Sequence, residues 1–160
     1  MIDVKNLHKY FGSLEVLKGI DCHIDKGECV CVIGPSGSGK STFLRCLNCM
    51  EDPTSGSIIF NGVDIADMRV DINIHRRHMG MVFQHFNLFN NMTVIENIMM
   101  APVYVRCKEL KKAKRNGTLA PDAPKTKAEI KAQARAEALE LLRRIGLEDK
   151  ADVYPSTLCL

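Results

Sequence analysis

The sequence predicts an α/β fold, and three observations lead to that expectation. Short β-type runs fill the first 33 residues, a Gly-rich loop follows the last of them, and a helical pattern begins directly after the loop. Two later stretches carry helix start signals. A chain of 160 residues is about one domain long and can bury a sizeable core.

The first β-type runs are residues 2–4, 16–24 and 28–33. The last run, Glu-Cys-Val-Cys-Val-Ile, is typical of a buried strand, and an Asp-Lys-Gly turn at 25–27 separates it from the run before. These patterns predict an antiparallel β segment in front of the loop.

The loop itself, residues 34–41, reads Gly-Pro-Ser-Gly-Ser-Gly-Lys-Ser and matches the phosphate-loop pattern G-x-x-x-x-G-K-[ST]. Its glycines permit backbone angles that turn successive N–H groups inward, forming an anion nest at a helix N-terminus. We expect Lys40 to reach the β- and γ-phosphates of ATP and the Ser41 hydroxyl to ligate Mg²⁺. A flexible Gly/Ser turn is the plainer alternative. The expected nucleotide-binding residues here are Gly34, Pro35, Ser36, Gly37, Ser38, Gly39, Lys40, Ser41 and Thr42.

After the loop the pattern predicts a helix over 41–49, a turn at 52–56, a strand over 57–60 and another strand over 79–83. The seven cysteines are irregularly spaced, and no secretion signal precedes them, so we expect reduced thiols in a cytosolic protein. Cys46 and Cys49 form a C-x-x-C on the helix, which we interpret as buried thiols rather than a metal or redox pair.

Two helices are expected in the second half of the chain. Thr93 and Glu96 have capping-box spacing, which predicts a helix that stops before Pro102. Residues 114–125 contain Gly and two Pro and predict a loop. A second capping box at Thr126 predicts a helix that ends at Gly146. Its apolar stripe comprises Ile130, Ala134, Ala138, Leu141, Leu142 and Ile145.

Composition is that of a globular protein, with 46% hydrophobic and 26% charged residues, and no apolar run approaches the roughly 20 residues of a membrane span. The net charge is +3, but residues 104–150 alone carry +6. Such a block meets nucleic acid, anionic lipid or an acidic partner, or it is a solvated surface. No aromatic residue lies between Tyr104 and Tyr154, so we expect no nucleic-acid partner.

Several stretches together carry a family resemblance. They are Leu-His-Lys-Tyr-Phe-Gly at 7–12, Glu-Val-Leu-Lys-Gly at 15–19, the phosphate loop with its helix, Met-Val-Phe-Gln-His-Phe-Asn-Leu-Phe at 81–89, and Met-Thr-Val-Ile-Glu-Asn at 92–97. The chain resembles the ATP-binding subunits of ABC transporters, most closely the branch for polar amino-acid uptake. The resemblance covers about residues 2–102 and 128–156.

The resemblance implies roles for two further residues. Phe11 aligns with the aromatic residue that stacks on adenine, although the register with Tyr10 is open by one residue and core packing is the alternative. Gln84 aligns with the glutamine that touches Mg²⁺ or the attacking water, where an amide oxygen is a neutral acceptor; without the resemblance it would be a surface residue. The implied metal residues are therefore Ser41 and Gln84.

The resemblance also implies an activity and an organisation. The activity is ATP hydrolysis that drives amino-acid import, performed with a membrane-spanning subunit and a second ATP-binding subunit at the cytoplasmic face of the plasma membrane. We expect a nucleotide-binding core over 1–103 and a partial helical subdomain over 104–160, with a basic insertion near 108–125.

The chain departs from the family after the Tyr-Pro-x-x-Leu at 154–158, where Cys159 and Leu160 stand in place of Ser-Gly-Gly-Gln. No apolar strand ending in Asp-Glu occurs either, so no catalytic carboxylate is identifiable, and the chain looks like a truncated or frame-shifted copy of such an ATP-hydrolysing subunit. The alternatives are a non-hydrolysing nucleotide-binding fragment and a small P-loop metabolite kinase. The kinase is less favoured because about 33 residues precede the loop.

Overall fold

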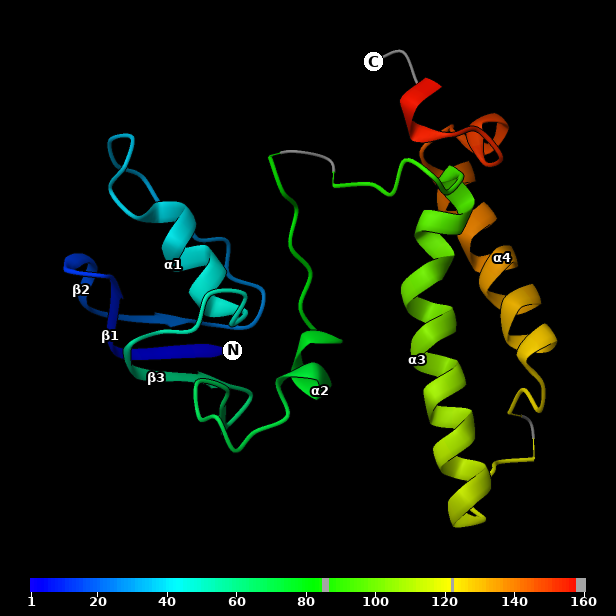
Figure 1. The fold of residues 1–160 in the computed structure, drawn as a ribbon, viewed down its shortest axis with the longest axis horizontal. Coiled ribbons are helices and arrows are strands. Elements are labelled where there is room, and N and C mark those ends of the chain that lie inside the picture. Colours follow the sequence, from blue (N-terminus) through cyan, green and yellow to red (C-terminus); the bar gives the residue numbers. More distant parts are fainter. Residues whose placement is uncertain (85–86, 122, 158–160) are drawn as a thin grey trace. The chain divides into compact units, whose positions relative to one another are not determined.

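The computed structural model describes residues 1–84, 87–121 and 123–157, and it divides into two compact units, 1–82 and 83–160 (Figure 1). The Leu158 end of the Tyr-Pro-x-x-Leu stretch lies outside the described residues, as do positions 85 and 86 of the 81–89 stretch. No helix in the described ranges is long and apolar enough to cross a lipid bilayer.

The first unit is built on a four-stranded antiparallel sheet in the order β2-β1-β3-β4. The hairpin of β1 and β2 closes through the two residues between Phe11 and Leu14, which confirms the antiparallel segment predicted in front of the loop. The strands span Ile2–Phe11 (β1), Leu14–Ile24 (β2), Ser55–Phe60 (β3) and Val63–Asp64 (β4).

The core of this unit lies between the sheet and the helix that follows the loop, α1 (Lys40–Leu47). Leu7 and Ile58 from the sheet and Cys46 from α1 are fully buried. The strands approach very closely at Gly56, where an added Cβ would stand 2.3 Å from the Asn6 carbonyl oxygen. Only glycine fits there, because the position also has a φ of +95°. A short helix, α2 (Ile72–Arg76), ends the ordered elements of the unit.

Two segments that the sequence predicts as strands do not form strands in the structure. Residues 28–33 and 79–83 lie in the chain without ladder partners among the described residues. Val32 is 40% exposed and Ile33 is 86% exposed. Apolar β-branched residues make a strand only when a neighbouring strand accepts their backbone hydrogen bonds, and the described sheet ends at β2 and β4.

The second unit is a helical hairpin of α3 (Val94–Asn116) and α4 (Lys127–Arg144), followed by two short 3₁₀ turns, η1 (Glu148–Lys150) and η2 (Pro155–Thr157). The expectation that the first helix stops before Pro102 is wrong. The helix continues through Pro102 to Asn116, where Gly117 ends it in a left-handed conformation. The run Lys-Glu-Leu-Lys-Lys-Ala-Lys-Arg at 108–115 has high helix propensity, and packing against α4 stabilises the helix.

The capping box predicted at Thr93 is found: its hydroxyl accepts the Glu96 backbone N–H, and the Glu96 carboxylate accepts the Thr93 backbone N–H. At Thr126 half of the box is present, because the hydroxyl accepts the Glu129 backbone N–H while the Glu129 carboxylate accepts the backbone N–H of Lys125. Four members of the predicted stripe on α4 are buried: Ile130, Ala134, Ala138 and Leu142. The two others are exposed, Leu141 by 51% and Ile145 by 67%, because they lie off the face that packs on α3.

Candidate functional site

The Gly-rich loop leads into α1 without a side-chain cap. Gly37 and Gly39 have φ values of +79° and +89°, a left-handed backbone that a residue with a Cβ rarely adopts. Gly39 is the N-cap, and its carbonyl accepts the Phe43 N–H at 2.8 Å. Since no side chain caps the first turn, its N–H groups are available to an anion at the positive end of the helix.

Lys40 folds back across the mouth of this loop. Its Nζ donates to the carbonyl oxygens of Gly34 at 2.8 Å and Pro35 at 2.7 Å, and it lies 3.4 Å from the Ser38 hydroxyl. The ammonium therefore contacts neutral oxygens and forms no ion pair with a carboxylate in the part of the chain that the structure describes. A phosphate oxygen entering the loop would replace neutral acceptors with a charged one, which forms a stronger, charge-assisted hydrogen bond.

The loop is tightly packed on both sides. A Cβ at Gly34 would stand 2.9 Å from the Ser38 hydroxyl oxygen, and a Cβ at Gly39 would stand 3.0 Å from Val16 Cγ1 on β2. At Gly39 the loop is thus held against β2 with no room for a side chain, whereas the close contact at Gly34 lies within the loop itself. Of the nine residues predicted here, Gly34 to Gly39 form the turn and Lys40, Ser41 and Thr42 begin α1.

The residues expected to hold Mg²⁺ are divided between the two units. Ser41 is exposed in the first turn of α1, and its hydroxyl is the hard oxygen ligand that Mg²⁺ prefers. In the described ranges no group of three or more His, Cys, Asp and Glu side chains forms a metal site. Gln84 is exposed and belongs to the second unit, so its place beside the metal stays a prediction.

Phe11 lies at the end of β1 and is 46% exposed, so it is not a core residue. The Lys9 ammonium lies 4.9 Å from the centroid of its ring. That ammonium also donates to the Asp52 carbonyl at 2.7 Å and pairs with Glu51 at 2.8 Å, which ties the ring to the chain just after α1. Sequence reasoning missed Lys9; its position two residues before Phe11, on the same strand face, is the signal that points to it.

The neighbouring aromatic residue, Tyr10, has a different environment. Its hydroxyl is hydrogen-bonded to Glu15, which raises the pKa of Tyr10. Glu15 also contacts His8 Nδ1 at 2.8 Å. This hydrogen bond is the largest of the effects that lower the pKa of Glu15. Tyr10 is therefore engaged in a polar network, whereas the Phe11 ring has a cation over its face.

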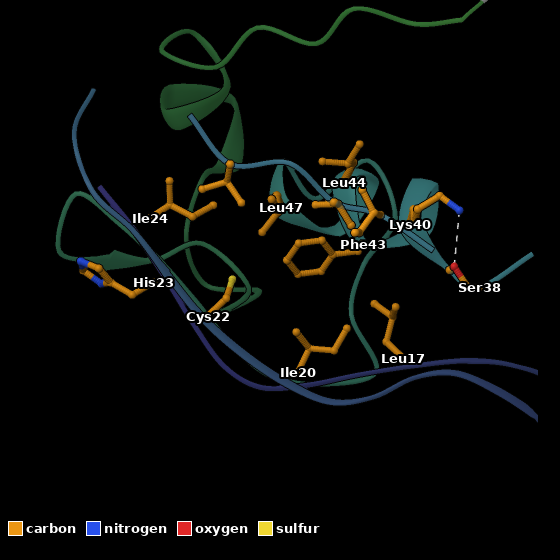
Figure 2. Close-up of a pocket in the computed structure, with 14 residues that line it drawn as sticks. Leu17, Ile20, Cys22, His23, Ile24, Ser38, Lys40, Phe43, Leu44 and Leu47 are labelled. Atoms are coloured by element: carbon orange, nitrogen blue, oxygen red, sulfur yellow. Dashed lines mark hydrogen bonds between the residues drawn. The ribbon is translucent and has the colours of Figure 1, made fainter. Parts of the chain in front are cut away.

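A cavity of about 310 Å³ lies next to the loop, between β2 and α1 (Figure 2). Figure 2 shows Ile20, Phe43 and Leu47 around it, with Lys40 and Ser38 at one edge. The remaining wall includes Val30 and Val32 of the unpaired segment. This apolar lining suits hydrocarbon rather than a triphosphate, so the loop beside the cavity, and not the cavity, stays the predicted phosphate site.

Comparisons with known proteins agree with this geometry. Residues 17–159 match a family model described as "ABC transporter". The chain is 43% identical over 158 residues to the glutamine transport ATP-binding protein GlnQ of Bacillus subtilis (strain 168) and 48% identical over 158 residues to the arginine transport ATP-binding protein ArtM of the same organism. Each alignment covers 99% of this chain and 57% of the relative.

A solved structure is also similar. The dimeric, post-hydrolysis ATP-binding cassette MJ0796 bound to ADP and Pi superposes with a TM-score of 0.73 at 28% sequence identity. The superposition covers 99% of this chain and 63% of that one. The chain therefore spans somewhat more than half the length of the proteins that it matches.

Proposed function

The chain belongs to the ABC transporter family, and we propose that its phosphate loop binds Mg²⁺-ATP for an importer of polar amino acids. The fold is that of an ABC ATPase, as the resemblance in the sequence implied. Two of its relatives are named as transporters of glutamine and arginine. The observation that carries the proposal is the Lys40 ammonium, which spans the mouth of an uncapped helix start and is hydrogen-bonded to neutral oxygens.

Each part of the nucleotide has a proposed partner. The loop N–H groups and Lys40 hold the β- and γ-phosphates, and the Ser41 hydroxyl ligates Mg²⁺ with Gln84. Phe11 stacks on the base, and the Lys9 ammonium over its ring adds a cation–π contact that fixes the ring plane. We favour Phe11 over Tyr10 because Glu15 already holds the Tyr10 hydroxyl.

Hydrolysis and transport are proposed for the whole protein, together with a membrane-spanning subunit and a second ATP-binding subunit at the inner face of the membrane. Phosphoryl transfer needs metal, a positioned water and charge stabilisation together. The 160 residues contain neither Ser-Gly-Gly-Gln nor an apolar strand ending in Asp-Glu. We therefore expect the 160-residue polypeptide by itself to bind ATP without sustained turnover.

Calorimetry with Mg²⁺-ATP tests the proposal. Lys40→Ala removes the cation that faces the phosphates and is expected to abolish measurable binding. Lys26→Ala, which removes an exposed cation from the turn after β2, is the matched control and is expected to bind like the parent. Equal affinities of the two variants would contradict the proposal.

A second variant tests the base site. Phe11→Ala is expected to weaken ATP by about 1–3 kcal/mol and to leave inorganic triphosphate binding nearly unchanged. Equal losses of affinity for both ligands would show that the Phe11 ring supports the fold and does not stack on the base.

A further inference from the structure

One end of the α3–α4 hairpin concentrates positive charge that the nucleotide site does not use. Residues 108–131 hold eight cations and three acids. We call these cations the basic tip; all eight are exposed, and they are Lys108, Lys111, Lys112, Lys114, Arg115, Lys125, Lys127 and Lys131. They occupy the last turns of α3, the loop after it and the first turns of α4, at the bottom of the hairpin in Figure 1.

The helical spacing gathers these charges on one surface. Lys108, Lys111, Lys112 and Arg115 stand at i, i+3, i+4 and i+7, which is a single face of α3. The loop brings in further charge, because the Lys114 Nζ donates to the Lys125 carbonyl oxygen at 2.8 Å. The patch is therefore continuous from α3 through the loop to the start of α4.

Cations outnumber acids at the basic tip by eight to three. Three arginines elsewhere on the hairpin are paired: Arg106 with Glu137 at 2.6 Å, Arg135 with Asp152 at 3.2 Å and Arg143 with Glu148 at 2.9 Å. No ion pair of this kind involves the basic tip within the described residues.

Glu129, one of the acids at the tip, caps the start of α4. Its carboxylate accepts the Lys125 backbone N–H at 2.8 Å and the Thr126 hydroxyl at 3.0 Å.

We propose that the basic tip docks on the surface of an anionic phospholipid bilayer. Seven of its eight cations are lysines, whose compact, strongly hydrated charges suit a diffuse negative surface better than a bidentate site. No large apolar residue between Tyr104 and Leu141 is exposed among the described residues, so the contact is electrostatic and nothing inserts into the hydrocarbon. The choice of a bilayer over a nucleic acid rests on the proposed membrane-transport function and on the absence of aromatic residues for base stacking.

Vesicle co-sedimentation of the 160-residue chain tests this docking. The chain is expected to bind phosphatidylglycerol–phosphatidylcholine vesicles at low salt and to dissociate from them near 1 M salt. It is not expected to bind vesicles of pure phosphatidylcholine. Each lysine near an anionic surface strengthens association by about fivefold, so Lys108→Gln/Lys111→Gln/Lys112→Gln is expected to weaken it roughly 100-fold. Glutamine keeps the helix, since its helix propensity is close to that of lysine.

The matched control is Lys5→Gln/Lys18→Gln/Lys26→Gln, which removes the same charge from exposed positions of the first unit. This triple variant is expected to bind vesicles like the parent. Equal weakening by both triple variants, equal binding to neutral and anionic vesicles, or tighter binding to duplex DNA than to anionic vesicles at the same salt would overturn the inference.

Calorimetry with Mg²⁺-ATP on the same variants keeps this inference separate from the proposed function. The basic-tip triple variant is expected to bind ATP normally while losing the vesicles. A chain that binds vesicles through the basic tip yet never binds ATP would refute the nucleotide site and leave the docking intact.

Discussion

β1 and the segment 28–33 lie in the same compact unit and both contain β-branched apolar residues, yet their backbones have different surroundings. β1 is hydrogen-bonded to β2 on one edge and to β3 on the other, and its Leu7 is fully buried. The segment 28–33 has no ladder partner in the described sheet, and Val30 is 48% exposed. The partner of β1 arrives after a two-residue turn, whereas a strand in a parallel sheet needs a crossover of a dozen residues or more.

This difference has a consequence for the nucleotide site. The phosphate loop joins the unpaired segment on one side to α1 on the other, so its rigidity comes from α1 and from contacts with β2. The Val16 and Leu17 side chains that face Gly39 supply those contacts. The loop can therefore hold its shape while the segment before it remains exposed.

The largest expected effect concerns stability. Leu7→Ala opens a cavity in the paired sheet and is expected to lower the free energy of unfolding by about 2–5 kcal/mol. Val32→Ala removes similar hydrocarbon from the unpaired segment and is expected to change it by less than about 0.5 kcal/mol. Urea unfolding followed by circular dichroism measures both. Similar losses would mean that the segment is packed like β1.

Cysteine reactivity sharpens the comparison without any substitution. Cys29 and Cys31 lie exposed in the segment, whereas Cys46 is buried and its pKa is raised to about 11, chiefly by desolvation. Since the thiolate is the reactive form, we expect Cys46 to be alkylated at least about 100-fold more slowly near pH 8. Mass spectrometry after timed iodoacetamide treatment gives the rates by residue. Slow reaction at Cys29 and Cys31 would show that the segment is covered.

The same contrast explains what the sequence could predict. The antiparallel β segment, the phosphate loop and the start of α4 are specified locally, by short β-type runs, by glycine positions and by the Thr126 cap, and each was predicted. The strands expected at 28–33 and 79–83 were wrong because strand formation depends on a partner distant in the chain.

The length of α3 and the surroundings of Phe11 depended on packing between segments, which the rules for single residues do not include. The continuation of α3 through Pro102 reflects the helix-favouring run after it and the contact with α4. The contact between Lys9 and Phe11 requires the strand geometry and the position of Asp52 together. The roles of Phe11 and Gln84 stay predictions.

The smallest expected effect lies where the paired hairpin ends. His23 pairs across the strands with Asp3 and also contacts Asp25 at 3.2 Å, and hydrogen bonds to these two carboxylates raise its pKa. A raised folded-state pKa stabilises the fold fully below the ordinary histidine value of about 6.5, and the stabilisation is lost as pH rises through the folded-state pKa.

We therefore expect the urea midpoint of the parent to fall slightly between pH 6 and pH 8, relative to that of His23→Gln. The effect is modest because His23 is half exposed. Identical pH profiles for the two proteins would show that His23 is not held by these carboxylates and that the hydrogen-bonded hairpin ends before it.

The central claim, that the loop at 34–42 is the phosphate-binding site, is tested most directly by backbone amide NMR during titration with Mg²⁺-ATP. Direct hydrogen bonds from loop N–H groups to phosphate oxygens move the amide signals of the bonded residues. The account predicts saturable shifts concentrated at residues 34–42, absent in Lys40→Ala and preserved in the basic-tip triple variant. Unchanged loop signals, with the largest shifts at residues 108–115 instead, would show that ATP is held only by the general positive charge of the hairpin and would contradict the claim.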